Sequence, residues 1–219
     1  NNRYRTNSEA VIISCFFNPQ NSYYRLKAFD TWYKSIKHLN HRIIECVIGD
    51  AQPQLGIYND PNITVVHTKN LLWHKETLLN KIVSDLPKKF KYVFWVDTDV
   101  MFSNLDWLVQ GVEKLKTNNI IQPFEYCVHL EKDELEPTDV KKFINDCEDA
   151  LNGITSSNRR VWRSFSANYE DRNFTHCHYS KNYDIHGHVG FVWGAKRTIL
   201  DNVPLYDKAL IGGADHIIA

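Results

Sequence analysis

A short apolar run that ends in two aspartates constrains the fold of this chain more than any other feature. Residues Tyr92–Val96 carry aromatic and β-branched side chains at consecutive positions, which is typical of a strand covered on both faces, as in a parallel α/β sheet. Asp97 and Asp99 follow directly, and sheets of this kind bind ligands beyond the carboxyl ends of their strands. Two hard oxygen donors at that place can hold Mg²⁺ or Mn²⁺ and leave coordination positions open for phosphate oxygens.

The same two aspartates also have a structural interpretation, because Asp commonly caps turns and helices after strands. The apolar residues that follow, Val100–Phe102, favour the metal site. They hold the carboxylates beside a core, where an unpaired charge is costly. The motif alone leaves both interpretations open.

Apolar periodicity predicts strands that alternate with helices along the chain. We expect strands at Ala10–Phe17, Ile43–Ile48, Ile63–His67, Lys91–Val96 and Ile120–Pro123, and helices at Tyr24–Lys37, Trp73–Val83 and Asp106–Lys116. This alternation indicates βαβ units, and hence an α/β fold with a mostly parallel central sheet flanked by helices. The polar stretch from Cys127 to Tyr183 is interpreted as a loop-rich insertion on the open side of the sheet, where substrates are usually selected, with solvated surface as the alternative.

Composition and charge exclude some classes of partner. Lys plus Arg and Asp plus Glu number 26 each, so no surplus positive charge is available for a nucleic-acid backbone, and we expect no nucleic-acid partner. The sequence has no apolar run of about 18 residues, so we expect no membrane span. The five scattered cysteines favour a reducing compartment and hence the cytoplasm, whereas the Asn-x-Thr sequons at Asn62 and Asn173 would suit the secretory pathway. The start without a methionine leads us to expect a piece of a longer protein.

Four further segments accompany the aspartate pair: Phe16-Phe17-Asn18 and Gly49-Asp50 at two strand ends, the helix at residues 73–80, and Gly212-Gly213-Ala214-Asp215-His216. Together with the pair they resemble a GT-A-fold glycosyltransferase that uses a nucleotide-sugar donor. The resemblance covers nearly the whole chain. It implies one GT-A (Rossmann-like) domain over residues 1–219, with a nucleotide-binding half at 1–126 and an acceptor-side half at 127–219.

The resemblance implies roles for the strand-end residues. Asp97 and Asp99 match the Asp-x-Asp motif that binds Mn²⁺ or Mg²⁺ at the donor diphosphate. Phe16, Asn18 and Asp50 match positions that line the base and ribose pocket.

The helix at residues 73–80 adds two candidate donor-binding residues. Lys75 is a candidate second cation for the diphosphate, and Asn80 is a candidate partner of the ribose or of the aspartate loop. A lysine beside a glutamate on a helix is more often an ordinary surface residue, and Asn80 has a capping role as its alternative.

The segment His186–Ala195 resembles the strand and glycine-bearing loop that shape the sugar and acceptor pocket of this family. Trp193 offers a face on which a pyranose ring can stack, with a buried strand as the alternative. Histidines alternate at positions 176 and 178 and again at positions 186 and 188. This permits a zinc interpretation, but no third ligand stands at a suitable spacing.

The C-terminal motif supplies the catalytic candidate. In inverting members of the fold an acidic residue at a helix start serves as general base, which implies this role for Asp215. The chain has Ala214-Asp215 where many relatives have Glu-Asp, and an aspartate at a helix start has the alternative role of a cap. His216 is a candidate additional metal ligand.

These observations predict a metal-dependent, inverting glycosyltransferase of the hexosyl- or deoxyhexosyltransferase class. It would move a sugar from a UDP-sugar to a hydroxyl of a glycan or related acceptor. A nucleotidyltransferase that makes a nucleotide-sugar is one alternative, although no Gly-rich, basic loop follows the first strand. A non-catalytic glycan-binding domain is the other, and it would release neither UDP nor pyrophosphate.

Overall fold

The computed structural model of the protein describes residues 3–72, 74–129, 149, 161–170 and 186–209. The chain divides into two compact units. The larger unit comprises Asn1–Pro123 and Gly190–Ile218, and the smaller comprises Phe124–Val189 together with Ala219. The residues predicted to bind the donor, the metal or the acceptor proton belong to the larger unit, whereas the four alternating histidines belong to the smaller one.

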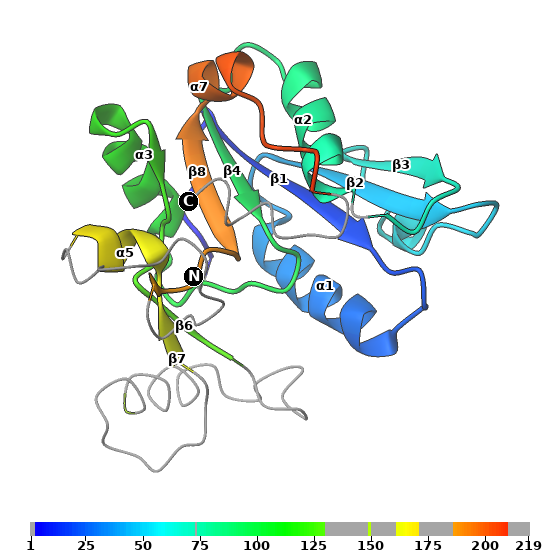
Figure 1. The fold of residues 1–219 in the computed structure, drawn as a ribbon. Coiled ribbons are helices and arrows are strands. Elements are labelled where there is room, and N and C mark those ends of the chain that lie inside the picture. Colours follow the sequence, from blue (N-terminus) through cyan, green and yellow to red (C-terminus); the bar gives the residue numbers. More distant parts are fainter. Residues whose placement is uncertain (1–2, 73, 130–148, 150–160, 171–185, 210–219) are drawn as a thin grey trace. The chain divides into compact units, whose positions relative to one another are not determined.

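A six-stranded sheet forms the centre of the larger unit, in the order β3-β2-β1-β4-β8-β5 (Figure 1). Its strands are β1 (Ala10–Phe17), β2 (His41–Ile48), β3 (Ile63–Thr68), β4 (Tyr92–Val96), β5 (Ile120–Ile121) and β8 (Val192–Lys196). Strands β1 to β4 run parallel to one another, whereas β8 runs antiparallel to both β4 and β5. The α/β class and the mostly parallel sheet expected from the sequence are confirmed.

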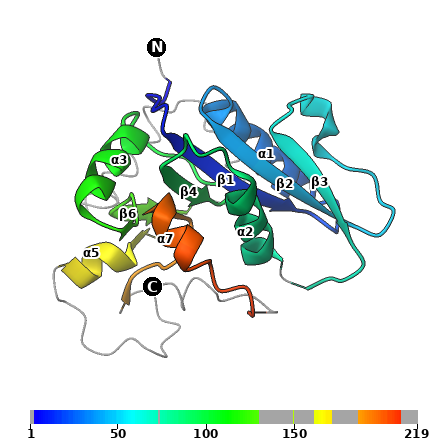
Figure 2. The same ribbon diagram turned by 90° about the horizontal axis from the view of Figure 1, so that it is seen from above.

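Helices cover both faces of this sheet. Successive strand residues point to opposite sides, so neighbouring residues of one strand contact different helices. The helices are α1 (Tyr23–Ile36), α2 (Lys75–Asp85), α3 (Trp107–Thr117) and α7 (Arg197–Asn202), with a 3₁₀ turn η1 at Leu55–Tyr58. On one face the Phe16 ring lies 4.8 Å from the ring of Phe29 in α1. On the other face the Cys15 thiol donates to the carbonyl of Lys75, at the start of α2. Helices α2 and α7 lie side by side (Figure 2).

Two glycines make room for the ring of Phe94 in the core. Phe94 is fully buried and packs edge-on against Trp107 of α3. A Cβ at Gly194 would lie 2.5 Å from the Phe94 ring, and one at Gly111 would lie 2.9 Å from it. These distances are shorter than van der Waals contact, so a side chain at either position would force the core apart.

A polar network joins α1 and the start of β2 to the loop that precedes β3. One carboxylate oxygen of Asp60 accepts hydrogen bonds from the Tyr33 hydroxyl (2.6 Å) and from the His41 ring (2.8 Å), and the other accepts the backbone N–H of Asn62 (2.8 Å). Burial alone would raise the pKa of Asp60, but these hydrogen bonds outweigh it and lower that pKa to about 2. The network therefore holds Asp60 as a carboxylate.

The helices and strands expected from the sequence agree with the observed ones to within two residues at every end. The strand β1 has the expected bounds, and the strand expected at Ile120–Pro123 ends at Ile121. Helix α2 begins at Lys75 rather than Trp73, and Trp73 itself lies outside the described residues.

The described part of the smaller unit contains a short antiparallel pair of strands, β6 (Tyr126–Val128) and β7 (Val161–Arg163), and the helix α5 (Phe165–Glu170). Gly187 has a positive φ of 79°, and a Cβ there would lie 2.6 Å from the carbonyl oxygen of Ser164. Only glycine fits this close approach. Most of the expected loop-rich insertion lies outside the described residues.

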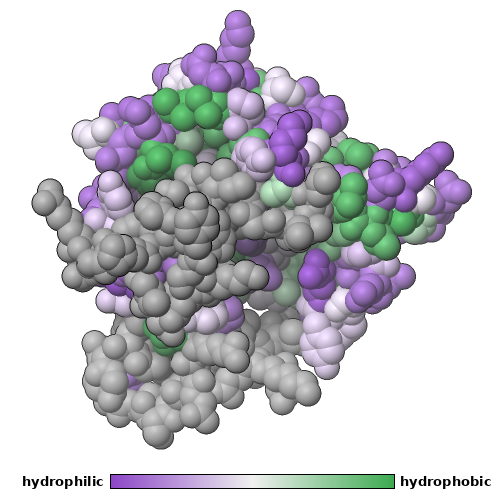
Figure 3. Space-filling model, in the orientation of Figure 1, coloured by the Kyte–Doolittle hydropathy of each residue, from purple (hydrophilic) through white to green (hydrophobic). Residues whose placement is uncertain are grey.

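The surface of the larger unit is mixed. Hydrophobic residues are visible in patches between hydrophilic ones (Figure 3), and the large apolar side chains that are exposed include Ile57 and Leu71. Single exposed apolar side chains of this kind are common on folded proteins. Within the described ranges, no helix combines the length and the apolar character needed to cross a lipid bilayer.

Candidate functional site

The two aspartates lie directly beyond the carboxyl end of β4, as the sequence predicts. The backbone N–H of Asp97 donates to the carbonyl of Phe191 (2.8 Å), just before β8, and the Asp97 carbonyl accepts from Val100 (3.4 Å). The turn that carries the carboxylates is therefore tied to the neighbouring strand and closed on itself. It provides a fixed place for two acidic side chains at the edge of a parallel sheet, where such folds bind ligands.

Lys75 lies against the first aspartate. Its ammonium is 2.6 Å from a carboxylate oxygen of Asp97, and the two side chains are 16% and 32% exposed. Because Lys75 is the first residue of α2 and its carbonyl accepts the Cys15 thiol, the cation is held close to the end of β1 as well. The sequence alone left Lys75 open between a site residue and a surface residue, and the structure places it at the aspartate pair.

The pKa of Asp99 reflects first the packing around its carboxyl and then its charged neighbours. Although Asp99 is exposed as a residue, the packing around its carboxyl and then the negative charge of Asp97 raise the pKa of Asp99. The positive charges of Arg25 and Lys75 act in the opposite direction. Two carboxylates and two cations therefore share this edge of the sheet.

Arg25 is a residue that the sequence analysis missed. It lies in the first turn of α1, and its guanidinium donates to the carbonyl of Phe17 at the end of β1 (2.7 Å). A cation in the first turn of a helix opposes the helix dipole, which costs about 0.3–1 kcal/mol when exposed. That unfavourable position, in the first turn of the helix that follows β1, was the available signal.

The donor set suits a divalent ion that takes part of its coordination from a ligand. Asp97 and Asp99 supply hard oxygen donors, which Mg²⁺ and Mn²⁺ prefer, and a cation would relieve the repulsion between the two carboxylates. Among the described residues, no three His, Cys, Asp or Glu side chains gather around one point. The remaining ligands would therefore be phosphate oxygens, water, or residues outside the described ranges.

Phe16 and Asn18 have structural surroundings at the end of β1. Phe16 is 1% exposed and packs on α1. The amide of Asn18 donates to Gln54 (2.8 Å) and to the Ser22 carbonyl (3.1 Å), and its oxygen accepts the Ser22 N–H (2.9 Å). Asn18 thus fixes the turn between β1 and α1, and the predicted contact of these two residues with a nucleoside stays a prediction.

Asp50 is the more open of the residues predicted to surround the base. It is exposed and lies in the turn after β2, where Gly49 adopts a positive φ of 57°. Its carboxylate is accessible to a ligand at the same edge of the sheet as the aspartate pair.

Asn80 and Trp193 are engaged inside the larger unit. The side-chain amide of Asn80 donates to the Leu205 carbonyl (2.8 Å) and its oxygen accepts the Leu205 N–H (2.9 Å), so that it holds the segment after α7. Trp193 is 3% exposed and stacks on Trp95, the residue opposite it in β4. These surroundings favour the structural alternatives that the sequence left open for both residues.

The other predicted residues are described in part or not at all. Asp215 and His216 lie outside the described residues, as do the histidines at positions 176 and 178. His186 is buried and the ring of His188 stacks near Trp162, with centroids 5.5 Å apart. The roles predicted for Asp215 and His216 stay predictions.

The chain matches no family model and no curated protein sequence. A number of solved structures resemble it at a low level, among them the following three. A protein from Desulfovibrio desulfuricans G20, described as a nucleotide-diphospho-sugar transferase, matches with a TM-score of 0.36 and 10% identity, over 52% of this chain and 57% of that chain. The 4-diphosphocytidyl-2C-methyl-D-erythritol synthase of Anaerococcus prevotii DSM 20548 gives a TM-score of 0.40 and 11% identity, over 90% and 72% of the respective chains.

The third structure, S. aureus TarS 1–349, gives a TM-score of 0.41 and 11% identity, over 95% of this chain and 53% of that one. The chain thus spans little more than half the length of two of these three proteins. Likeness at this level supports no assignment of family or function, so the function must be argued from the site itself.

Proposed function

We propose that this chain is a metal-dependent glycosyltransferase of the GT-A type that transfers a sugar from a nucleoside-diphosphate donor, a UDP-sugar, to a hydroxyl group of a glycan or related acceptor. The observation that carries the proposal is the group of charges at the carboxyl edge of the sheet. Asp97 and Asp99 follow β4, Lys75 contacts Asp97 at 2.6 Å, and the charge of Arg25 acts on Asp99. Paired carboxylates beside two cations are suited to a metal-bound diphosphate.

In this proposal Asp97 and Asp99 hold Mn²⁺ or Mg²⁺, with His216 as a candidate further ligand. The bound ion would stabilise the negative charge that develops on the departing diphosphate. Lys75 and Arg25 would bind non-bridging oxygens of the same diphosphate, Lys75 as a point charge and Arg25 through a bidentate contact. Lys75 and Arg25 lie in the first turns of α2 and α1. Their backbone positions are therefore fixed by regular helices.

The proposed reaction breaks the bond between the anomeric carbon and the diphosphate oxygen and forms a bond from that carbon to the acceptor oxygen. The nucleoside diphosphate leaves with the electron pair. The acceptor proton passes to Asp215, which serves as general base in an inverting displacement.

The base of the nucleotide is assigned to Asp50. Its exposed carboxylate can accept a hydrogen bond from the ring N–H of uracil, which cytosine lacks at that position. Substitution of Asp50 by Ala should weaken UDP binding more than CDP binding. Equal losses for the two nucleotides in competition experiments would remove Asp50 from this role.

Calorimetry of UDP binding tests the metal site. Wild type should bind UDP in the presence of Mn²⁺ and lose that binding in EDTA. Asp99→Ala should lose the Mn²⁺-dependent part while keeping its thermal unfolding midpoint, because the substitution also relieves repulsion between carboxylates. Asp85→Ala is the matched control, since Asp85 is an exposed aspartate whose contact with Lys81 lies at the far end of α2. Unchanged UDP affinity in Asp99→Ala would refute the site.

A donor assay then separates the enzyme classes. The proposal requires release of UDP from a UDP-sugar when a suitable acceptor is present. Release of pyrophosphate from UTP and a sugar phosphate would identify a nucleotidyltransferase instead. Mn²⁺-dependent thermal stabilisation across a panel of nucleotide-sugars selects the donor for this assay.

A further inference from the structure

A second group of positive charges lies at the opposite edge of the sheet from the aspartate pair. There β4 begins at Tyr92, and the antiparallel strand β8 ends at Lys196, which is the partner of Tyr92 in the register. Since β4 has five residues, this edge is roughly 16 Å from Asp97 along the strand. The two groups of charges therefore cannot belong to one small-molecule site.

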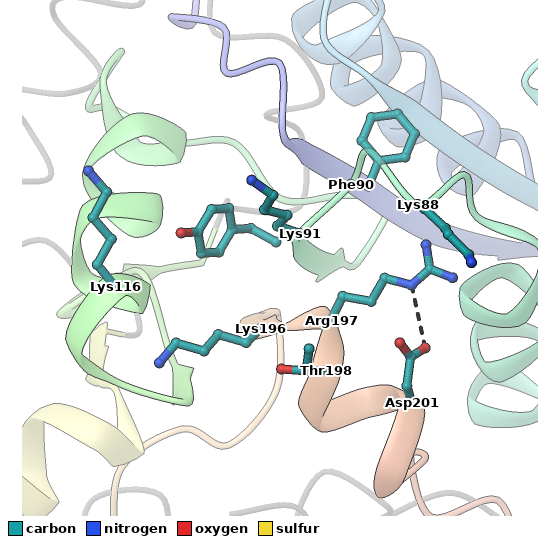
Figure 4. Close-up of a pocket in the computed structure, with 9 residues that line it drawn as sticks. Lys88, Phe90, Lys91, Lys116, Lys196, Arg197, Thr198 and Asp201 are labelled. Atoms are coloured by element: carbon teal, nitrogen blue, oxygen red, sulfur yellow. Dashed lines mark hydrogen bonds and ion pairs between the residues drawn. The ribbon is translucent and has the colours of Figure 1, made fainter.

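A cavity of about 580 Å³ opens at this edge, within the larger unit. This volume is in the range of small-molecule sites, about 300–1,000 Å³. Its basic lining residues are Lys88, Lys91, Lys116, Lys196 and Arg197, and its other lining residues are Phe90, Tyr92, Thr198 and Asp201. Figure 4 shows Lys116 and Lys196 on one side of the cavity, Lys88 and Arg197 on the other, and Lys91 between them.

Arg197 has a structural role in this cavity and is not counted among the residues that would bind a ligand. Its guanidinium donates to the carbonyls of Leu86 (2.7 Å), Pro87 (2.9 Å) and Val83 (3.3 Å), and it also pairs with Asp201 (3.4 Å). Its donors are thus committed to the end of α2 and to α7. Asp201, the one acidic side chain in the lining among the residues that the structure describes, is therefore already matched by the arginine.

The four lysines as a group keep a net positive charge, because only two of them are paired with an acidic side chain in the described part of the chain. Lys91 pairs with Glu9, and Lys116 pairs with Glu113 (2.7 Å). Lys196 contacts only the neutral amide oxygen of Asn119 (3.3 Å), and neither Lys196 nor Lys88 forms an ion pair with any acidic group that the structure describes. Two lysines on opposite sides of one cavity thus remain without a compensating charge. Like charges held around a concave surface focus a positive potential on the space between them.

We propose that this cavity binds a small multivalent oxyanion of the di- or triphosphate class. Lysine ammonium groups bind phosphate as point charges, and the Tyr92 and Thr198 hydroxyls in the lining can donate hydrogen bonds to further oxygens. The anion would bridge Lys88 and Lys196 and would compete with Glu9 for Lys91 and with Glu113 for Lys116. This site is independent of the proposed glycosyltransferase site and does not require its metal.

Calorimetry with inorganic tripolyphosphate in EDTA tests the proposal, because the chelator removes the divalent ion on which the aspartate site depends. Wild type should bind the probe, with an affinity that falls as NaCl is added. Lys88→Ala/Lys196→Ala should weaken binding by about tenfold or more. The control variant Lys37→Ala/Lys114→Ala removes the same charge from exposed positions outside the cavity and should bind like wild type.

Two further variants complete the test. Lys75→Ala should leave tripolyphosphate binding in EDTA unchanged, since Lys75 is at the other edge. Lys88→Glu alone should abolish most binding, and it provides the decisive variant should the double substitution shift the thermal unfolding midpoint. A comparison of ATP with tripolyphosphate distinguishes a nucleotide from a free polyphosphate as the source of the anion. Absent binding by wild type, or equal losses in the cavity and control variants, would overturn the proposal.

Discussion

Lys75 should have opposite effects on the metal and on the nucleotide, and this gives the sharpest test of the candidate site. Its ammonium is 2.6 Å from Asp97, so a divalent ion at the aspartate pair would compete with it. A bound diphosphate, in contrast, would gain an attractive contact from the same ammonium. Lys75→Met removes the charge and keeps most of the aliphatic volume.

The expected change in affinity follows from the strength of the Lys75–Asp97 interaction, which depends on how exposed the two side chains are. Two unit charges 4 Å apart interact by about 1 kcal/mol in bulk water and by about 4 kcal/mol near a protein surface. Because Asp97 is 32% exposed, we take the lower part of this range, about 1–2 kcal/mol. Mn²⁺ alone should therefore bind Lys75→Met about tenfold more tightly than wild type, and UDP in saturating Mn²⁺ should bind about tenfold more weakly.

The assay is calorimetry of Mn²⁺ without nucleotide and of UDP with saturating Mn²⁺. Lys81→Met serves as the control, because Lys81 is in the same helix and its pair with Asp85 is exposed. Its affinities should equal those of wild type. Two changes of the same sign in Lys75→Met, or no change in either affinity, would refute the reasoning.

Three other outcomes are expected. The folded-state pKa of Asp60 is about 2, below its ordinary 3.8, so its carboxylate contributes about 2 kcal/mol of stability above pH 4, and this contribution is lost as the pH falls toward 2. In urea unfolding, Asp60→Asn should therefore lower the free energy of unfolding at pH 6 and have little effect on it at pH 2. A difference between variant and wild type that stays constant with pH would contradict this. Gly194→Ala should destabilise the fold by about 1–3 kcal/mol, because its Cβ would collide with Phe94, whereas Gly56→Ala, where nothing lies within 4 Å, should be tolerated in the same experiment. Asp215→Asn should keep UDP affinity and lose most sugar transfer, about 10²-fold or more; near-normal transfer, or a product with retained anomeric configuration by NMR, would remove Asp215 from the role of base.

Local patterns in the sequence were sufficient for the fold class and for most elements of the central sheet. Apolar periodicity depends only on which neighbours along the chain share a face, so it predicted β1 with its observed bounds and the other expected strands and helices to within two residues. It gave no bounds for β6, β7, β8, α5 or α7. Because βαβ alternation permits few topologies, the mostly parallel sheet followed. It also followed that Asp97 and Asp99 lie beyond the carboxyl end of a strand.

The surroundings of individual residues could not be predicted from the sequence, because they depend on which segments meet across the sheet. The pattern at the end of β1 could not tell that Phe16 would face Phe29 of α1 while Cys15 faced α2. It gave no reason to expect that Asn18 would bond Gln54, 36 positions away in the sequence. The burial of Trp193 against Trp95 likewise requires the register of β8 on β4.

At the charged site, too, some features could be predicted from the sequence and others required the tertiary structure. The sequence by itself determined the aspartate pair, since a strand followed by Asp-x-Asp is a local feature. Only the tertiary structure decided that Lys75 contacts Asp97 and that the charge of Arg25 acts on Asp99. The lysine cavity at the other edge also depends on β8 returning antiparallel to β4, which places Lys196 opposite Tyr92. Distances between charges far apart in the sequence are set by the chain path through the sheet, and no local pattern records that path.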